Sequence, residues 1–292
     1  MVLGKEEAIK MALVTLISRG HLLIEDVPGV GKTTLALCMA RATECDFRRI
    51  QFTSDLLPSD ILGVNIYNPE TRDFEFRPGP IFANIVLADE INRTNPKTQS
   101  ALLEVMNERR VSIEGKTMPL DAPFMVIATQ NPLEYHGTFP LPESQLDRFM
   151  MHLKIGYPSY EDEKRAVVEM RDFQYIESLK PVVTRREILQ TQEDVRAVRA
   201  DDSIVDYVMR TVRATRGDER IRLGASTRGA KYLLTAARGA AWYEGRDYVL
   251  PEDVKAVFVP VLAHRIMLKT RGFISDAEEV LYDIMEKIPV PV

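Results

Sequence analysis

Short apolar runs alternate with amphipathic stretches over roughly the first half of the chain. A run of four to eight apolar residues between turn residues is typical of a buried strand, and apolar positions three and four apart indicate a helix. This alternation predicts an α/β domain. The predicted strands are Leu22–Glu25, Phe47–Thr53, Ile85–Asp89, Phe124–Thr129 and Met151–Ile155, and the predicted helices lie at 3–19, from Lys32 onward, at Pro96–Glu108 and at Pro142–Phe149.

Two stretches interrupt this alternation. Residues 54–83 are rich in Pro, Gly, Asn and Asp and contain a short alternating piece at Asp73–Arg77, which indicates an inserted loop or hairpin. Residues Val111–Leu120 alternate around Glu114-Gly115 and predict a second hairpin.

The pattern changes at Tyr157-Pro158-Ser159, after which the periodicity is almost entirely helical. We therefore expect an α/β nucleotide-binding domain over residues 1–156 and an α-helical domain over residues 157–292. The predicted helices of the second domain are Tyr160–Phe173, Glu187–Ala200, Ser203–Arg216, Thr227–Tyr243, Pro251–Lys269 and Asp276–Lys287.

Composition narrows the class of protein. Apolar residues make up 45% and charged residues 28% of the 292 residues, as in a globular protein, and the net charge of −5 argues against a dominant nucleic-acid surface. Two cysteines build no disulfide framework, which favours a reducing compartment. No run approaches 18 apolar residues and no signal-peptide pattern is present, so we expect a cytoplasmic protein without a membrane partner.

The loop Asp26–Gly31 joins the first predicted strand to a helix that starts at Lys32. Such a junction directs backbone N–H groups and a helix N-terminus at one point, which is a phosphate site. The strict pattern G-x-x-x-x-G-K-[ST] would place a glycine where this chain has Asp26, so an ordinary strand-to-helix turn is the alternative. The predicted nucleotide-binding residues are Pro28, Gly29, Val30, Gly31, Lys32, Thr33 and Thr34.

Acidic and amide side chains follow two of the other predicted strands. Asp89 and Glu90 end the apolar run IVLADE, at the edge of an α/β sheet where ligands bind. Asp89 is expected to hold Mg²⁺ together with Thr33, and Glu90 to take a proton from the water that attacks the γ-phosphate. Asn131 follows the fourth strand and is expected to orient that water, although an ordinary turn Asn before Pro132 fits its position as well.

Two arginines complete the predicted site. Arg148, in the sequence LDRF, is a candidate arginine finger that stabilises the transferring phosphoryl group in trans. Arg228 starts a helix of the second domain and is expected to contact the γ-phosphate. The alternative for each is an ordinary surface arginine, with Asp147 as a partner for Arg148.

Together, HLLIEDVPGVGKT, LPSDILG, GPIFANIVLADEINR, ATQNPLEYHGTFPLPESQLDRF and GRDYVLPEDVKAVFVPVLAHR resemble the motifs of MoxR family AAA+ ATPases in order and spacing. The resemblance implies a P-loop AAA+ core with a parallel sheet, a helix-2 insert near 56–80, a hairpin before sensor 1 near 110–121, and a helical lid. It also implies Walker A at Lys32 and Thr33, Walker B at Asp89 and Glu90, sensor 1 at Asn131, the arginine finger at Arg148 and sensor 2 at Arg228. Asp26 matches the MoxR form of the loop, whereas Thr227 stands where the family usually has Pro.

The resemblance further implies Mg²⁺-dependent ATP hydrolysis by a homo-oligomeric ring, expected to be a hexamer. This hydrolysis would drive chaperone-like remodelling or maturation of a client, often a protein with a von Willebrand A domain. Three alternatives stay open at this point: a chelatase motor subunit, a nucleic-acid-stimulated AAA+ ATPase, and a nucleotide-bound scaffold that does not hydrolyse. The acidic composition weighs against the second, and the intact Asp89-Glu90 pair against the third.

Overall fold

The computed structural model describes residues 3–132, 137–169, 175–176, 178–270 and 274–291, and the chain divides into two compact units. The first unit takes residues 1–9, 23–141 and 154–188, and the second takes 10–22, 142–153 and 189–292. Residues 133–136, within the stretch ATQNPLEYHGTFPLPESQLDRF that carries part of the family resemblance, lie outside the described residues, as do the last four residues of the helix predicted at 160–173. The domain boundary expected after residue 156 stays a prediction.

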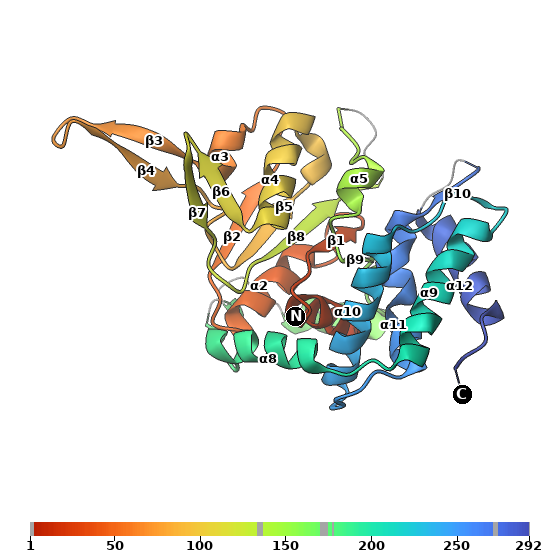
Figure 1. Cartoon of the computed structure of the whole chain (residues 1–292). Coiled ribbons are helices and arrows are strands. Elements are labelled where there is room, and N and C mark those ends of the chain that lie inside the picture. The colour runs from red at the N-terminus through yellow and green to blue at the C-terminus, as the bar shows by residue number, and fades with distance from the viewer. Residues whose placement is uncertain (1–2, 133–136, 170–174, 177, 271–273, 292) are drawn as a thin grey trace. The chain divides into compact units, whose positions relative to one another are not determined.

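A five-stranded sheet has the strand order β2-β5-β8-β1-β9 (Figure 1). Strand β5 pairs in parallel with β2 on one side and β8 on the other. All residues of β5 are buried, which explains its continuous apolar run, because a strand covered on both faces has no solvent side to mark with polar residues. The strands are β1 (Leu22–Glu25), β2 (Phe47–Gln51), β5 (Ile85–Asp89), β8 (Met125–Gln130) and β9 (Met151–Leu153), close to the predicted ranges.

Helix starts in the first unit follow local chemistry. Helix α4 (Pro96–Glu108) begins where the Asn95 side chain accepts hydrogen bonds from the backbone N–H groups of Lys97 and Thr98, both at 3.1 Å. Its first residue is Pro96, which lacks the N–H that would have no intrahelical partner there. The other helices that begin in this unit are α1 (Glu6–Ile17), α2 (Lys32–Ala42), α3 (Pro58–Leu62), η1 (Ile91–Arg93), α6 (Tyr160–Glu169) and α8 (Arg185–Ala197).

The stretch predicted as an inserted loop or hairpin contains α3 and an antiparallel hairpin of β3 (Gly63–Asn68) and β4 (Asp73–Pro78). Figure 1 shows this hairpin extending away from the sheet strands of its unit. The second predicted hairpin is confirmed as β6 (Arg110–Ile113) and β7 (Lys116–Pro119). Glu114 and Gly115 between them both have positive φ, as a two-residue turn of the I′ type requires.

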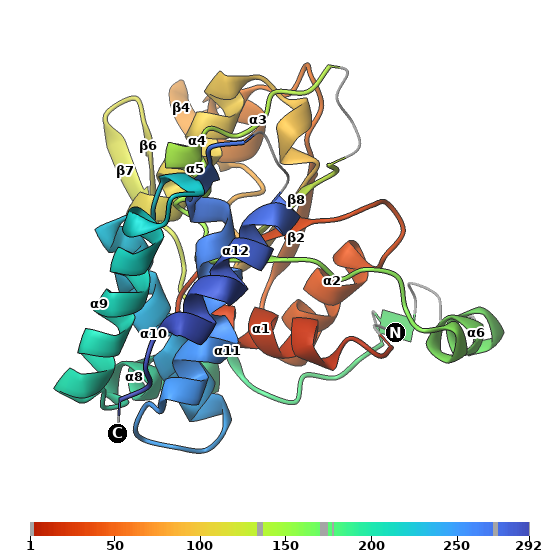
Figure 2. The same cartoon turned by 90° about the vertical axis from the view of Figure 1, so that its right-hand side faces the viewer.

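The second unit is built on helices, with α10 (Thr227–Tyr243) packed against α9 (Asp202–Gly217) and α11 (Pro251–Leu262) (Figure 2). The helix predicted over Pro251–Lys269 is too long. It ends at Leu262 and continues as a 3₁₀ turn, η2 (Ala263–Arg265), and strand β11 (Met267–Leu268), which pairs with β10 (Ile221–Leu223). This pairing joins distant segments, so helical periodicity alone did not reveal it. The unit also contains α5 (Glu143–Leu146) and α12 (Ile274–Lys287).

Among the described helices, none is both long and apolar enough to cross a membrane.

Candidate active site

A pocket of about 370 Å³ in the first unit collects most of the predicted site residues. Of the predicted set, only Val30, Arg148 and Arg228 do not line it; Val30 is buried, and the two arginines belong to the second unit. One lining residue, Arg49, was not predicted. The lining residues are Pro28, Gly29, Gly31, Lys32, Thr33, Thr34, Arg49, Asp89, Glu90 and Asn131.

The loop between β1 and α2 has the backbone conformation of an anion site. Gly29 and Gly31 have φ values of +87° and +94°, and a Cβ at either position would meet no atom within 4 Å. Both glycines are therefore required by conformation rather than by lack of space. Gly31 caps α2 without a side-chain hydrogen bond, and Lys32, Thr33 and Thr34 of the first turn line the pocket, as at a helix N-terminus that binds an anion. The Lys32 ammonium donates to the carbonyl oxygens of Asp26 and Val27 at 2.6 and 3.1 Å.

Asp26 anchors this loop, which explains why the first glycine of the strict pattern is absent. Its Oδ1 accepts a hydrogen bond from the backbone N–H of Val27 at 2.8 Å. Its Oδ2 accepts from the backbone N–H groups of Ile155 and Gly156, at 2.7 and 2.6 Å. The residue is only 9% exposed, and a glycine there would leave all three donors without this acceptor. The carboxylate thus ties the loop to a segment that is distant in sequence.

Asp89 and Glu90 sit at the carboxyl end of β5 and share a partner. The Thr129 hydroxyl donates to Asp89 Oδ1 at 2.6 Å and accepts from the Glu90 backbone N–H at 2.8 Å. Glu90 has a φ of +58°, a left-handed conformation that costs free energy for a residue with a side chain. Its Oε2 accepts from Gln51 Nε2 at 2.8 Å and from Arg93 Nη1 at 3.0 Å.

Arg49 is the site residue that the sequence reasoning missed. Its Nε and Nη2 both donate to Asp89 Oδ2, at 3.1 and 2.6 Å. The parallel register that pairs β2 with β5 puts Gln51 opposite Asp89, and Arg49, two residues earlier, points to the same face. The available signal was the alternation of FRRIQ, in which Arg49 and Gln51 share one side of a strand next to the acidic one.

The donor set fits a Mg²⁺ ion. Magnesium prefers oxygen ligands and is usually held by one or two carboxylates together with substrate phosphates. The Thr33 hydroxyl and the Asp89 carboxylate are such ligands, and both line the pocket beside the anion-binding loop. The Arg49 guanidinium is a competing cation at one oxygen of Asp89.

The two remaining predicted residues are described within the second unit alone. Arg148 follows α5 and is half-buried, and its carbonyl oxygen accepts from the Tyr232 hydroxyl at 3.4 Å. Arg228 is exposed in the first turn of α10, as predicted, and its Nη1 lies 3.4 Å from Asp147 Oδ2. Asp147 also pairs with the buried Arg265, which sequence reasoning did not single out. The roles of Arg148 and Arg228 at a nucleotide stay predictions.

Comparisons with known proteins agree with this geometry. Residues 21–151 match the family model "ATPase family associated with various cellular activities (AAA)", and residues 213–286 match the AAA lid domain. The chain is 48% identical to the uncharacterized protein YeaC of Bacillus subtilis, over the whole chain and 92% of that protein. It is 41% identical to the chaperone MoxR1 of Mycobacterium tuberculosis, over the whole chain and 80% of that protein. A crystal structure of a Cytophaga hutchinsonii protein provisionally described as an ATPase superposes with a TM-score of 0.88 at 39% identity, covering 98% of this chain and 90% of the other.

Proposed function

Since the chain belongs to the MoxR family of AAA+ ATPases, we propose that it hydrolyses ATP with Mg²⁺ and uses the energy, as a ring of identical subunits, to remodel a client protein. The observation that carries the proposal is the pocket in which Lys32, Thr33 and the acidic pair Asp89-Glu90 converge. A cationic loop facing two carboxylates suits phosphoryl transfer, whose transition state needs positioning and charge stabilisation rather than covalent chemistry.

Each residue of the first unit has a proposed role. The α2 N-terminus and Lys32 bind the phosphates, and Thr33 and Asp89 hold the metal ion, which when bound neutralises charge on the phosphate oxygens. Glu90 accepts the proton of the attacking water, and Asn131 orients that water. Gln51 and Arg93 keep the Glu90 carboxylate in place through the hydrogen bonds described above.

Two predicted arginines outside this pocket also have proposed roles, and the ring is needed for one of them. We assign Arg148 to the γ-phosphate bound by a neighbouring copy, and Arg228 to the nucleotide of its own copy. An arginine supplied in trans raises kcat by about 10³- to 10⁵-fold in the enzymes where it has been measured. A hexamer, a client with a von Willebrand A domain and a cytoplasmic location complete the proposal. Cys38 and Cys45 are not joined in a disulfide, which supports a reducing compartment.

The first test replaces Glu90 with Gln, which keeps the shape of the side chain but removes its basicity. We expect ATP turnover to fall at least 100-fold while binding of a fluorescent ATP analogue changes less than twofold, because general-base catalysis contributes about 10²- to 10⁴-fold. Glu104→Gln, an equivalent change on the exposed face of α4, is the control and should turn over normally. Normal turnover by Glu90→Gln would exclude Glu90 as the base.

The second test examines the shared site. Arg148→Ala and Lys32→Ala should each be inactive alone, because one lacks the finger and the other the phosphate ligand. Mixed in equal amounts, they form some interfaces with an intact Lys32 from one copy and an intact Arg148 from its neighbour. Turnover should therefore recover in the mixture. No recovery at any ratio would contradict a site completed by a neighbouring copy.

A further inference from the structure

Arg265 is a buried cation that uses every hydrogen-bond donor it has. It ends the 3₁₀ turn η2 and is only 6% exposed. A guanidinium carries five N–H donors. Its Nε donates to Asp147 Oδ1 at 2.9 Å. Its Nη1 donates to the carbonyl oxygen of Val261 and to that of Met150, the latter at 3.2 Å. Its Nη2 donates to the carbonyl oxygen of Phe149 and to that of Asp147, the latter at 3.1 Å.

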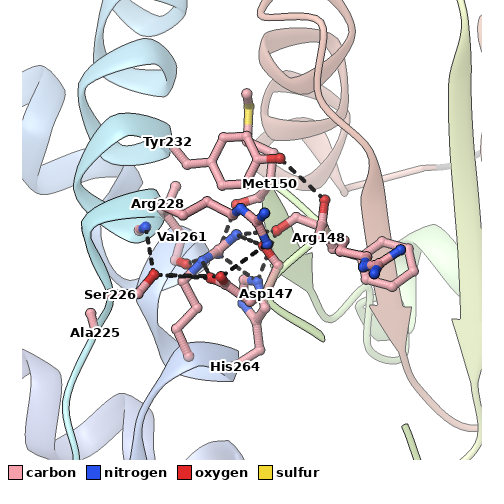
Figure 3. A network of polar contacts seen from close by, with 12 residues as sticks. Asp147, Arg148, Met150, Ala225, Ser226, Arg228, Tyr232, Val261 and His264 are labelled. Atoms are coloured by element: carbon pink, nitrogen blue, oxygen red, sulfur yellow. Dashed lines mark hydrogen bonds and ion pairs between the residues drawn. The ribbon is translucent and has the colours of Figure 1, made fainter. Parts of the chain in front are cut away.

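Four of these five acceptors belong to the tetrapeptide 147–150, which contains Arg148. The dashed contacts in Figure 3 gather between Asp147, Met150 and Val261. The Tyr232 hydroxyl donates to the one remaining carbonyl oxygen of the tetrapeptide, that of Arg148, at 3.4 Å. The Tyr232 ring also lies 5.0 Å from the Arg265 guanidinium, within the range of a cation–π contact. Two side chains therefore hold all four carbonyls of the segment.

The charge states of Arg265 and His264 favour a stable contact between Arg265 and segment 147–150. Burial lowers the pKa of the Arg265 guanidinium to about 10, while the Asp147 carboxylate opposes that shift, so Arg265 stays cationic at neutral pH. Burial, and next the charge of Arg265, hold the pKa of His264 well below its usual range, so the neighbouring ring is neutral and adds no second charge. Its Nε2 contacts the Phe149 carbonyl at 3.1 Å and Arg265 Nη1 at 2.6 Å.

We propose that Arg265 is a positioning residue for Arg148, fixing the backbone from which the trans-acting guanidinium projects. The inference rests on the proposed function of Arg148 in the ring. Tetrapeptide 147–150 has little regular structure of its own, because α5 is only four residues long and ends at Leu146. Its backbone N–H groups donate to main-chain carbonyl oxygens, those of Arg148 and Phe149 to Gln145 and Leu146. Its four carbonyl oxygens, in contrast, are held by the side chains of Arg265 and Tyr232. The other oxygen of Asp147 faces Arg228 at 3.4 Å, so the same cluster also contacts the second proposed active-site arginine.

The test is Arg265→Lys in the full chain. Lysine keeps the charge but has three donors and no planar fork, so it cannot hold four acceptors of one segment. A displacement of about 1 Å at a catalytic group costs on the order of 100-fold in rate. We expect kcat to fall by about that factor, with the affinity for a fluorescent ATP analogue and the oligomeric state unchanged. Arg199→Lys, at an exposed arginine paired with Asp247, is the control and should change nothing.

Subunit mixing separates a positioning role from a general structural one. Arg265→Lys mixed with Lys32→Ala should recover up to about a quarter of the wild-type rate, the fraction of interfaces in a random ring that pair an intact site with an intact finger. Arg265→Lys mixed with Arg148→Ala should recover nothing, because both lack the same function. Recovery of turnover in the mixture of Arg265→Lys with Arg148→Ala would overturn the inference. So would a lack of recovery in the mixture of Arg265→Lys with Lys32→Ala, provided that Arg148→Ala mixed with Lys32→Ala does recover.

Failure of the proposed function has a different signature. If Arg148→Ala and Lys32→Ala do not recover together, the finger in trans is excluded, and the inference falls with it. If Arg265→Lys does not fold, as judged by circular dichroism, Tyr232→Phe carries the test, because it removes only the hydroxyl that holds the Arg148 carbonyl. We then expect kcat to fall about threefold with nucleotide affinity unchanged, and an unchanged kcat would overturn the inference.

Discussion

Replacing Asp26 with Gly would restore the strict phosphate-loop pattern, and we predict that it damages the protein. The Asp26 carboxylate accepts three backbone hydrogen bonds, from Val27, Ile155 and Gly156. Glycine has no acceptor to offer them, and it also adds backbone freedom to the unfolded chain. The prediction runs against the sequence pattern, which would favour the glycine.

The magnitude follows from the burial of the three donors. A hydrogen bond to a charged group contributes about 1.5–3 kcal/mol to stability, so three would contribute several kcal/mol. Ile155 is buried, whereas Val27 and Gly156 are only partly buried and regain some hydration when the carboxylate is removed. We therefore expect the free energy of unfolding to fall by about 3–5 kcal/mol. Asp26→Asn keeps one acceptor oxygen and should lose about 1–2 kcal/mol.

Urea unfolding followed by circular dichroism measures the difference. With a slope of about 3 kcal/mol per molar urea, the midpoint for Asp26→Gly should fall by about 1–1.7 M. Asp201→Gly is the control, because Asp201 precedes α9 without a side-chain cap bond, and glycine at such a position costs only a few tenths of a kcal/mol. If Asp26→Gly were as stable as the parent and bound an ATP analogue more tightly, the anchoring role of Asp26 would be refuted.

Two further predictions concern Arg49 and His264. Arg49→Gln removes the cation that competes at Asp89 Oδ2. The Mg²⁺ concentration for half-maximal binding of an ATP analogue should therefore fall about two- to fivefold, which corresponds to the free energy of a partly exposed ion pair. Arg48→Gln is the neighbouring control, and a higher Mg²⁺ requirement in Arg49→Gln would contradict the competition. Burial holds the pKa of His264 well below its usual range, so below about pH 6.5 the unfolded chain binds a proton at this residue that the folded chain does not. The free energy of unfolding should therefore fall as the pH drops below about 6.5, by up to about 1.4 kcal/mol per pH unit. His264→Gln should remove this part of the pH dependence in urea titrations at pH 7.5 and 5.5, and an unchanged dependence would show that His264 is not its source.

Much of the fold follows from local patterns. The buried run Ile85–Asp89 and the hairpin turn at Glu114-Gly115 were predictable because burial on both faces and positive φ leave marks on neighbouring residues. The end of α11 was not predictable in this way, because Met267 and Leu268 belong to a strand that pairs with β10, more than forty residues earlier in the chain. Helical spacing in a sequence does not say whether a distant strand competes for the same residues.

The candidate site, too, contains features set by the local sequence and features set by distant segments. The sequence by itself determined the phosphate loop and the acidic pair, because a strand, a glycine turn and a helix start within twelve residues already constrain the backbone. Only the tertiary structure decided that Asp26 is bound by Ile155, that Arg49 pairs with Asp89, and that Arg265 holds the segment of Arg148. These partners lie 40 to 129 residues apart. The free energy that such a contact contributes depends on its burial and on its hydrogen-bond geometry, and packing sets both only after the chain has folded.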